Sequence, residues 1–183
     1  AGSDARMGGS AMPVMTTAGS GNIGLTASLP VITFCRECNK SDEQLYRALF
    51  FSHLTTIHVK AKIGRLSAYC GPMCAAAAVA GAIGFVNDFD FQTVSNAIVN
   101  TLGGVSGIVC DGANSSCPIK IANGTYAAYD GIAMAANGNV ITVGDGIVGQ
   151  DVEQTINNIA EMAQKGMDVT DKVILDIMTR DDI

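Results

Sequence analysis

Residues 75–86 read Ala75-Ala76-Ala77-Ala78-Val79-Ala80-Gly81-Ala82-Ile83-Gly84-Phe85-Val86 and form the longest uninterrupted apolar run of the chain. The run has 12 residues, whereas a helix needs about 20 apolar residues to cross a bilayer. An alanine-rich run of this length is typical of a helix buried inside a protein. We therefore expect a buried helix that begins near Ser67 and continues to Val86.

The composition of the whole 183-residue chain resembles that of this run. Hydrophobic residues make up 48% and charged residues 15%, and Gly and Ala contribute 21 and 24 residues. Disordered chains have low hydrophobicity and high charge, so this composition excludes disorder. Aromatic residues are only 5%, which argues against a core of aromatic side chains. Small residues let helices approach one another closely or bring backbone close to a ligand.

Capping residues and helical spacing predict further helices on both sides of this run. Ser41 precedes two acidic residues and opens a helix to about Val59, whose apolar positions are Leu45, Leu49, Phe50, Leu54 and Ile57. The other expected segments are a loop over 1–24, a short or broken helix over 25–34 because of Pro30, helices over 90–102, 120–137, 151–166 and 170–179, an irregular segment over 105–118, and a loop over 138–149 with an extended piece at 140–143. Strand patterns are scarce. The predicted fold is all-α, a compact bundle of tightly packed Gly/Ala-rich helices with Gly-rich ligand-bearing loops, in a single domain over 1–183.

The charge of the chain limits its partners. The net charge is −6, the pI is about 4.7, and Lys and Arg do not cluster, so we expect no nucleic-acid partner. Neither a membrane span nor a signal peptide is recognisable, so we expect no membrane partner, a cytoplasmic location and reduced cysteines. The chain starts at Ala1 with a Gly-rich stretch, and we interpret it as an excised piece of a longer protein.

Three of the six cysteines have a simple structural interpretation. Cys35 and Cys38 form a C-x2-C pair, which is half of a common zinc site, but no second pair follows. Cys74 enters the alanine run and is most simply a small core residue.

The other three cysteines stand beside glycine or proline at the edges of predicted helices. Cys70 precedes Gly71-Pro72, Cys110 precedes Asp111-Gly112, and Cys117 precedes Pro118. A thiolate in such a loop accepts backbone N–H bonds, which lower its pKa. A metal held by three cysteines keeps one open position, as catalytic metals do. From these residues alone, buried thiols beside turns are an equally good interpretation.

A third glycine-rich segment, Gly19-Ser20-Gly21-Asn22-Ile23-Gly24, precedes an apolar stretch. Its N–H groups and the following helix N-terminus predict a seat for a carboxylate or phosphate. The segment lacks the Gly-Lys-Ser/Thr of a P-loop and the βαβ context of a dinucleotide site. An ordinary glycine-rich loop with an N-cap is the alternative.

Five segments in this order resemble the serine dehydratase alpha-chain family, most closely its branch with L-cysteine desulfidase; they are 4–9, 19–22, 64–71, 110–117 and 166–171. The resemblance implies a helical fold and a [4Fe-4S] cluster held by Cys70, Cys110 and Cys117. It implies a lyase that eliminates sulfide from L-cysteine or water from L-serine to give pyruvate and ammonia. The base that removes the α-proton stays unknown.

Further roles follow from the positions of polar residues around these loops. Ser20, Gly21, Asn22 and Arg65 are the candidate substrate-binding residues, for the carboxylate or the amino group of a small amino acid. Lys120 also flanks the ligand loops, but a salt bridge with an aspartate is the simpler role for it. Asp111 is expected to position its loop through backbone hydrogen bonds.

Members of this branch are longer, with a region before Asp4 that carries further active-site residues. We therefore interpret the chain as the C-terminal, cluster-binding part, inactive alone, with the missing N-terminal region as its partner. A homo-oligomer is the other assembly considered. The alternative function is a non-catalytic amino-acid-binding or regulatory module that has lost its cluster. A structural zinc domain is a third reading, for which a fourth ligand is lacking.

Overall fold

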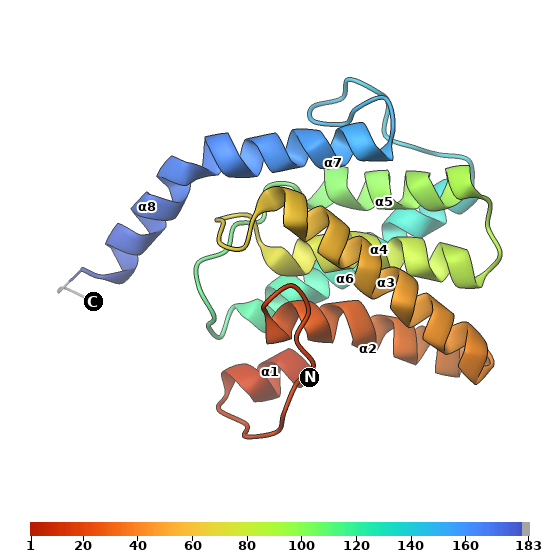
Figure 1. Ribbon diagram of the computed structural model, residues 1–183, viewed down its shortest axis with the longest axis horizontal. Helices are drawn as coiled ribbons and strands as arrows, with labels where there is room; N and C mark the ends of the chain where they lie inside the picture. Colours follow the sequence, from red (N-terminus) through yellow and green to blue (C-terminus); the bar gives the residue numbers. More distant parts are fainter. Residues whose placement is uncertain (181–183) are drawn as a thin grey trace.

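Helix α4 (Gly71–Val86) lies in the middle of the structure, and all its residues except Phe85 are buried. The computed structural model describes residues 1–180, and the regular elements in this range are helices (Figure 1). Around α4 these are α1 (Gly2–Met7), α2 (Gly21–Glu37), α3 (Asp42–Ile63), α5 (Phe91–Val105), α6 (Cys117–Ala136), α7 (Val152–Glu161), the π-helical turn η1 (Met162–Gly166) and α8 (Met167–Met178). The predicted all-α fold and the buried central helix are confirmed.

Helix α4 packs directly against α2, α3, α5 and α6, and its small side chains make this arrangement possible. A Cβ atom added to Gly81 would lie 2.8 Å from Cε1 of Phe51 on α3 and 2.9 Å from Cδ1 of Ile98 on α5. Gly131 on α6 is likewise in contact with Thr101 on α5. The helices therefore approach one another at positions where a larger residue would push them apart.

Larger apolar side chains fill the core on both sides of α4. One cluster joins α3, α4, α5 and α7 and includes Val59, Met73, Leu102 and Ile159. Another joins α2, α4 and α6 and includes Val31. Burying each such side chain contributes about 1.5–3 kcal/mol relative to its exposure. No helix in the described range is long and apolar enough to span a membrane.

Helix α3 buries only some of the apolar positions predicted for it, since Leu45 and Leu49 pack against the core whereas the other three do not. Phe50, Leu54 and Ile57 are exposed, whereas the buried face carries Ala48, Ser52, Thr56, Val59, Lys60 and Ile63. The hydroxyl of Ser52 donates to the carbonyl of Ala27 on α2 at 2.8 Å. The small side chains of Ala48, Ser52 and Thr56 on this face let α3 lie close to α2 and α4.

The N-terminal segment differs from the expected loop over 1–24. Helix α1 forms because Ser3 is buried against α2, where it bonds Asn22. Helix α2 begins at Gly21, with Ser20 as its N-cap, and continues through Pro30 to Glu37 instead of breaking. The proline removes one backbone donor, but packing against α3 and α4 maintains the helix on both sides of it.

Two helices begin at a cysteine rather than at the predicted residue. Helix α4 starts after Cys70 and not near Ser67, and α6 starts at Cys117 and not at Lys120. In both cases a proline, Pro72 or Pro118, occupies the second helical position, where its missing N–H costs nothing. Cys117 is therefore a helix residue and not part of the loop.

The C-terminal helices also differ from the prediction. Gly166 has a φ of −80°, so it does not end a helix in the left-handed conformation; the chain continues through η1 into α8, which begins before Thr170. Residues 140–143 form no strand. The capping roles of Ser41, Asp90 and Asp151 are confirmed, since each side chain accepts a backbone N–H from the first turn of its helix.

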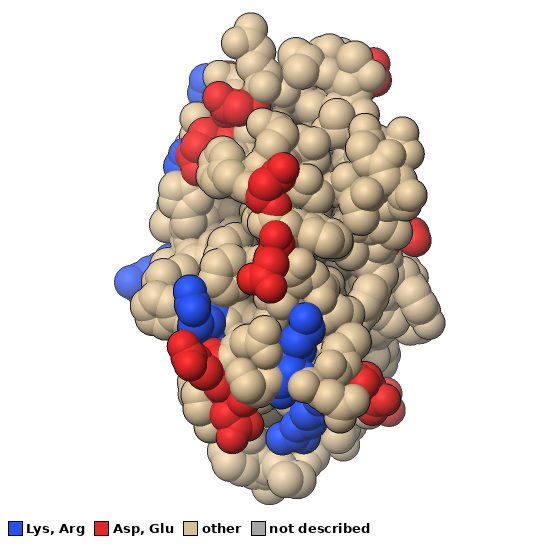
Figure 2. All heavy atoms as spheres, turned by 90° about the vertical axis from the view of Figure 1, so that its right-hand side faces the viewer, with Lys and Arg blue, Asp and Glu red and all other residues tan. Residues whose placement is uncertain are grey.

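Figure 2 shows the face at the right-hand side of Figure 1, onto which the N-terminal end of α3 and the C-terminal end of α2 open. Basic and acidic side chains lie beside one another on this face. Charges of both signs are therefore mixed over this part of the surface.

Candidate functional site

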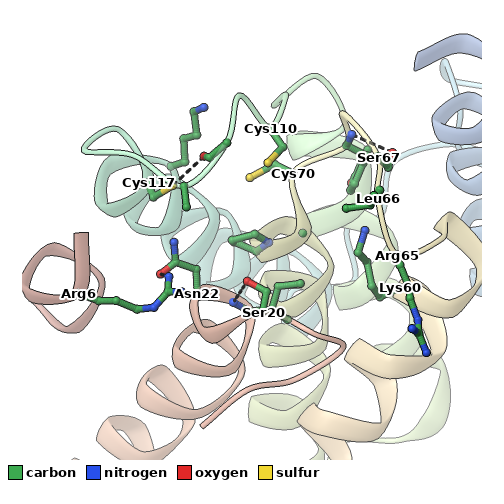
Figure 3. Close-up of a pocket in the computed structure, with 17 residues that line it drawn as sticks. Arg6, Ser20, Asn22, Lys60, Arg65, Leu66, Ser67, Cys70, Cys110 and Cys117 are labelled. Atoms are coloured by element: carbon green, nitrogen blue, oxygen red, sulfur yellow. Dashed lines mark hydrogen bonds between the residues drawn. The ribbon is translucent and has the colours of Figure 1, made fainter. Parts of the chain in front are cut away.

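A cavity of about 210 Å³ lies where the start of α2, the end of α3 and two loops meet (Figure 3). Its walls come from α1, the N-terminus of α2, the end of α3, the loop over 64–70, the loop over 106–116 and the start of α6. Cys70, Cys110 and Cys117 line this cavity together with Ser20 and Asn22. Residues from the three predicted ligand segments therefore meet in one place.

Backbone pairing holds Cys70 beside Cys110. The N–H of Cys110 donates to the carbonyl of Ala68 at 2.6 Å, and the N–H of Cys70 donates to the carbonyl of Ile108 at 3.2 Å. These bonds flank an isolated antiparallel bridge between Tyr69 and Val109. In Figure 3 the two sulfur atoms point toward each other.

The third thiol comes from the other side of the cavity. Cys117 is the first residue of α6, and its Sγ donates to the carbonyl of Gly112 at 3.5 Å. All six cysteines of the chain are free. Within residues 1–180, no three His, Cys, Asp or Glu side chains lie close enough together to hold a single metal ion. The thiols are thus not arranged as a mononuclear zinc site.

Three helices direct their N-termini at this cavity. Ser20 caps α2, Cys70 occupies the cap position of α4, and Cys117 begins α6. Each of these helices has at least 16 residues. The N-terminus of a helix carries a partial positive charge and unpaired N–H groups, so the cavity favours an anion or a thiolate.

The side chains that line the cavity add to this positive potential. Arg6, Lys60, Arg65 and Lys120 belong to its walls, and no carboxylate from residues 1–180 does. Lys120 forms a salt bridge with Asp111, outside the lining, as the simpler interpretation of its role predicts. Arg65 lies on the exposed rim and its side chain points away from the cysteines (Figure 3). Its role as a substrate-binding residue stays a prediction.

The orientation of the Asn22 side chain is set by two donors. Its Oδ1 accepts from Ser3 Oγ at 3.2 Å and from Arg6 Nη1 at 3.0 Å. The remaining polar atom, Nδ2, has only a long contact of 3.8 Å with the sulfur of Met7. The amide group that Asn22 can offer to a ligand is therefore a donor.

Gly21 supports the site by leaving room for Arg6, and it does not itself contact the cavity. A Cβ atom at this position would lie 2.6 Å from Cγ2 of Val14 and 2.9 Å from Nε of Arg6. Gly21 does not line the cavity. Its absence of a side chain lets Arg6 reach across the start of α2 to Asn22.

Burial and neighbouring charges shift the pKa values of two residues of the site, Cys70 and Asp111. The pKa of the Cys70 thiol is raised to about 12, chiefly by burial and also by the neighbouring thiols of Cys110 and Cys117, and Lys120 opposes this rise. Its hydrogen bond with Lys120 lowers the pKa of Asp111, with Asn114 as a second donor. Asp111 thus holds its loop through the side chains of Lys120 and Asn114 rather than through the predicted backbone hydrogen bonds, because both side chains reach its carboxylate.

The remaining cysteines lie outside the cavity. Cys35 is buried in α2, Cys38 is exposed at its end, and Cys74 is buried in the core. None of them lines the cavity. Burial raises the pKa of Cys74 to about 12, as for a thiol in a core.

Among the wall residues that the sequence analysis did not identify as candidates are Arg6, Lys60 and Tyr69. Lys60 continues the four-residue series Ala48, Ser52 and Thr56 on the buried face of α3, and this series of small and polar residues was the available signal. The hydroxyl of Tyr69 is buried and has no hydrogen-bond partner within the described residues. No sequence signal distinguishes it from an ordinary core tyrosine.

Comparison with known proteins gives one family. The family model for the serine dehydratase alpha chain matches residues 1–176. A UPF0597 protein of Fusobacterium nucleatum is 58% identical over 180 residues, covering 98% of this chain and 42% of that protein. A UPF0597 protein of Treponema denticola is 49% identical, covering 99% of this chain and 42% of that protein. No solved structure gives a significant match.

The chain thus spans less than half the length of the curated relatives it matches. The match of the family model runs through every wall of the cavity, from Arg6 to Lys120. On this match, the chain belongs to the serine dehydratase alpha-chain family.

Proposed function

We propose that the chain is the cluster-binding part of an iron–sulfur-dependent lyase that eliminates sulfide from L-cysteine or water from L-serine. The observation that carries the proposal is the meeting of Cys70, Cys110 and Cys117 on one cavity, below the N-termini of three helices. Membership in the serine dehydratase alpha-chain family supports it, since this family is associated with iron–sulfur serine dehydratases.

The donor set suits a [4Fe-4S] cluster better than a single ion. Each cysteine would bind a different iron, so the thiols need not be as close together as in a mononuclear site. With three cysteines for four irons, the bound cluster would supply one Lewis-acidic iron with an open position for the leaving group of the substrate. Because burial raises the pKa of the Cys70 thiol, binding of the cluster would displace its proton, and the positive helix ends would stabilise the bound thiolates.

The chain's own residues would hold the amino acid beside this position. Asn22 offers only donors, so it would bind the carboxylate of the substrate rather than its ammonium group. Ser20, whose oxygen accepts from the N–H of Ile23 at 3.4 Å, keeps its hydroxyl proton for the same carboxylate. The cavity, with a volume of about 210 Å³, is large enough for a small amino acid.

The reaction balances without a redox partner. A base removes the α-proton, the electron pair forms the Cα–Cβ double bond, and sulfide or water leaves from Cβ. The resulting enamine takes up water and gives pyruvate and ammonia. We assign no base within the described residues, and it would come from the part of the longer protein that this chain does not match.

That remaining part would also be the main partner of the chain, since the relatives are more than twice as long. The activity therefore belongs to the whole protein, and the chain alone is expected to be inactive. We place the protein in the cytoplasm, where six free cysteines stay reduced.

Anaerobic reconstitution tests the proposal. This chain and the full-length relative from Fusobacterium nucleatum should each take up about four irons per chain and absorb broadly in the visible range. Cys110→Ser should abolish uptake, whereas Cys38→Ser, at an exposed cysteine outside the cavity, should not change it. Assays of the reconstituted full-length protein with both amino acids would identify the substrate. Failure of both proteins to bind iron would overturn the proposal, and ligand binding without iron would favour a non-catalytic module.

A further inference from the structure

Lys60 is a buried cation that opens onto the cavity. It lies near the end of α3 with 6% of its surface exposed, and it lines the cavity beside Ile23 and Gly71. Its Cε atom is 3.9 Å from the place that a Cβ of Gly71 would take. In Figure 3 its ammonium group points into the cavity, in contrast to the guanidinium of Arg65.

The ammonium group of Lys60 has no anionic partner. No carboxylate within residues 1–180 lies within salt-bridge distance of it, and its Nζ donates no hydrogen bond to a described residue. The other lysines each have a partner: Lys40 bonds the carbonyl of Val86, and Lys62, Lys120, Lys165 and Lys172 pair with carboxylates. Lys60 is both the most buried lysine and the unpaired one.

The stem of Lys60 is buried, whereas its Nζ is accessible from the cavity and faces it without an anionic partner among residues 1–180. An anion in this cavity would therefore gain a charge-assisted hydrogen bond that no described residue supplies. The cavity walls supply further donors, the Nδ2 of Asn22 and the hydroxyl of Ser20, but no acidic group to compete for the cation. A small cavity with one cation and several donors fits a carboxylate on a small molecule.

We propose that Lys60 binds the α-carboxylate of the amino-acid ligand, with Asn22 as a second donor to the same group. This inference rests on the proposed function for the identity of the ligand. Lys60 is thereby a ligand-binding residue. The protein side chains would recognise the carboxylate of the amino acid, whereas they would not contact its leaving group.

The test compares L-alanine with L-alaninamide on the anaerobically reconstituted chain. Both lack a leaving group on Cβ and cannot be turned over, and they differ in the negative charge of the carboxylate. The wild-type chain should bind L-alanine more tightly than L-alaninamide. Lys60→Gln should weaken L-alanine binding by about ten- to hundredfold and leave L-alaninamide binding unchanged. Lys62→Gln, on the same helix at a lysine already paired with Glu153, is the matched control and should change neither.

Stability gives a second measurement. Because Lys60 is unpaired, Lys60→Met should raise the unfolding midpoint of the ligand-free chain, whereas loss of a merely structural residue would lower it. Any of four results would overturn the assignment. Two concern the wild-type chain, namely equal affinities for the two compounds or no binding of either. The other two concern the variants, namely a lowered unfolding midpoint in Lys60→Met or an equal loss of affinity for both compounds in Lys60→Gln. Iron content is measured separately. If the chain takes up iron normally but gives one of these four results, the role of Lys60 is contradicted and the proposed function is not. Charge-dependent binding without iron uptake would contradict the proposed function alone.

Discussion

The hydroxyl of Thr17 lies 2.8 Å from Nδ1 of His53, and this hydrogen bond ties the loop before α2 to the middle of α3. Nε2 of the same ring lies 3.2 Å from the hydroxyl of Ser28 on α2. Thr17 in turn pairs with Ser20 through two backbone hydrogen bonds of 3.1 and 3.2 Å. His53 therefore fixes the position of Ser20 without lining the cavity.

Protonation of His53 should destabilise the fold. Burial lowers its pKa from the ordinary value of 6.5, so the folded chain binds this proton less readily than the unfolded chain. The free energy of unfolding should be greatest above pH 6.5 and should fall as the pH drops below it, by at most about 1.4 kcal/mol per pH unit. Urea unfolding between pH 5 and 8 measures this slope. His53→Gln should flatten it, and His58→Gln, at an exposed histidine, should retain it; an unchanged slope in His53→Gln would contradict the argument.

Gly24→Ala should destabilise the chain because a Cβ atom at this position would overlap the carbonyl of Met15. Backbone cannot yield as a flexible side chain does, so we expect a loss of about 1–3 kcal/mol or more in the free energy of unfolding. Gly104→Ala is the matched control: Gly104 lies in α5 with nothing within 4 Å, and this change should stabilise the chain by about 0.5–1 kcal/mol. Equal effects of both changes in urea unfolding would count against the close packing of residues 15–24.

Asn22→Asp should separate stability from binding. The new carboxylate would face Arg6, whose Nη1 now lies 3.0 Å from Oδ1, and would add a negative charge to the cavity. The melting temperature should not fall, because the charge gains cationic neighbours. Binding of L-alanine should weaken by at least about tenfold, because like charges repel. Asn123→Asp, on the exposed side of α6, is the control and should leave binding unchanged. Undiminished binding by Asn22→Asp would exclude Asn22 from the carboxylate site.

Lys120→Met should loosen the loop between Cys110 and Cys117. The salt bridge of Lys120 with Asp111 closes this loop, and Asn114 also donates to the Asp111 carboxylate at 3.1 Å. Without the bridge, a reconstituted chain should release iron to a chelator several times faster, because two of its proposed ligands move more freely. Lys165→Met, which removes an exposed pair with Glu161, should leave the release rate unchanged. Identical rates for both variants would show that the bridge does not support the site.

Much of the site could be predicted from glycine-rich segments and from family resemblance, whereas the spacing of the cysteines along the chain did not predict it. The loops with Cys70, Cys110 and Cys117, and the residues Ser20 and Asn22, stand out as glycine-rich segments, and family resemblance connects them. Their meeting in one cavity depends on the bridge between Tyr69 and Val109, a pairing across 40 positions that no local pattern encodes. Arg6 lies in a segment that the sequence predicts as a loop, and Lys60 lies just beyond the predicted end of its helix at about Val59.

The sequence by itself determined that the chain is helical, that residues 75–86 are buried, and that Ser41, Asp90 and Asp151 begin helices. These features depend on hydrogen bonds and capping within a few residues, so neighbouring amino acids decide them. Only the tertiary structure decided which face of α3 is buried. Its apolar residues Phe50 and Leu54 lie outward, because the face with Ala48, Ser52, Thr56 and Lys60 packs against α2 and α4. Packing between distant segments selects this face, and it thereby brings a lysine to the cavity.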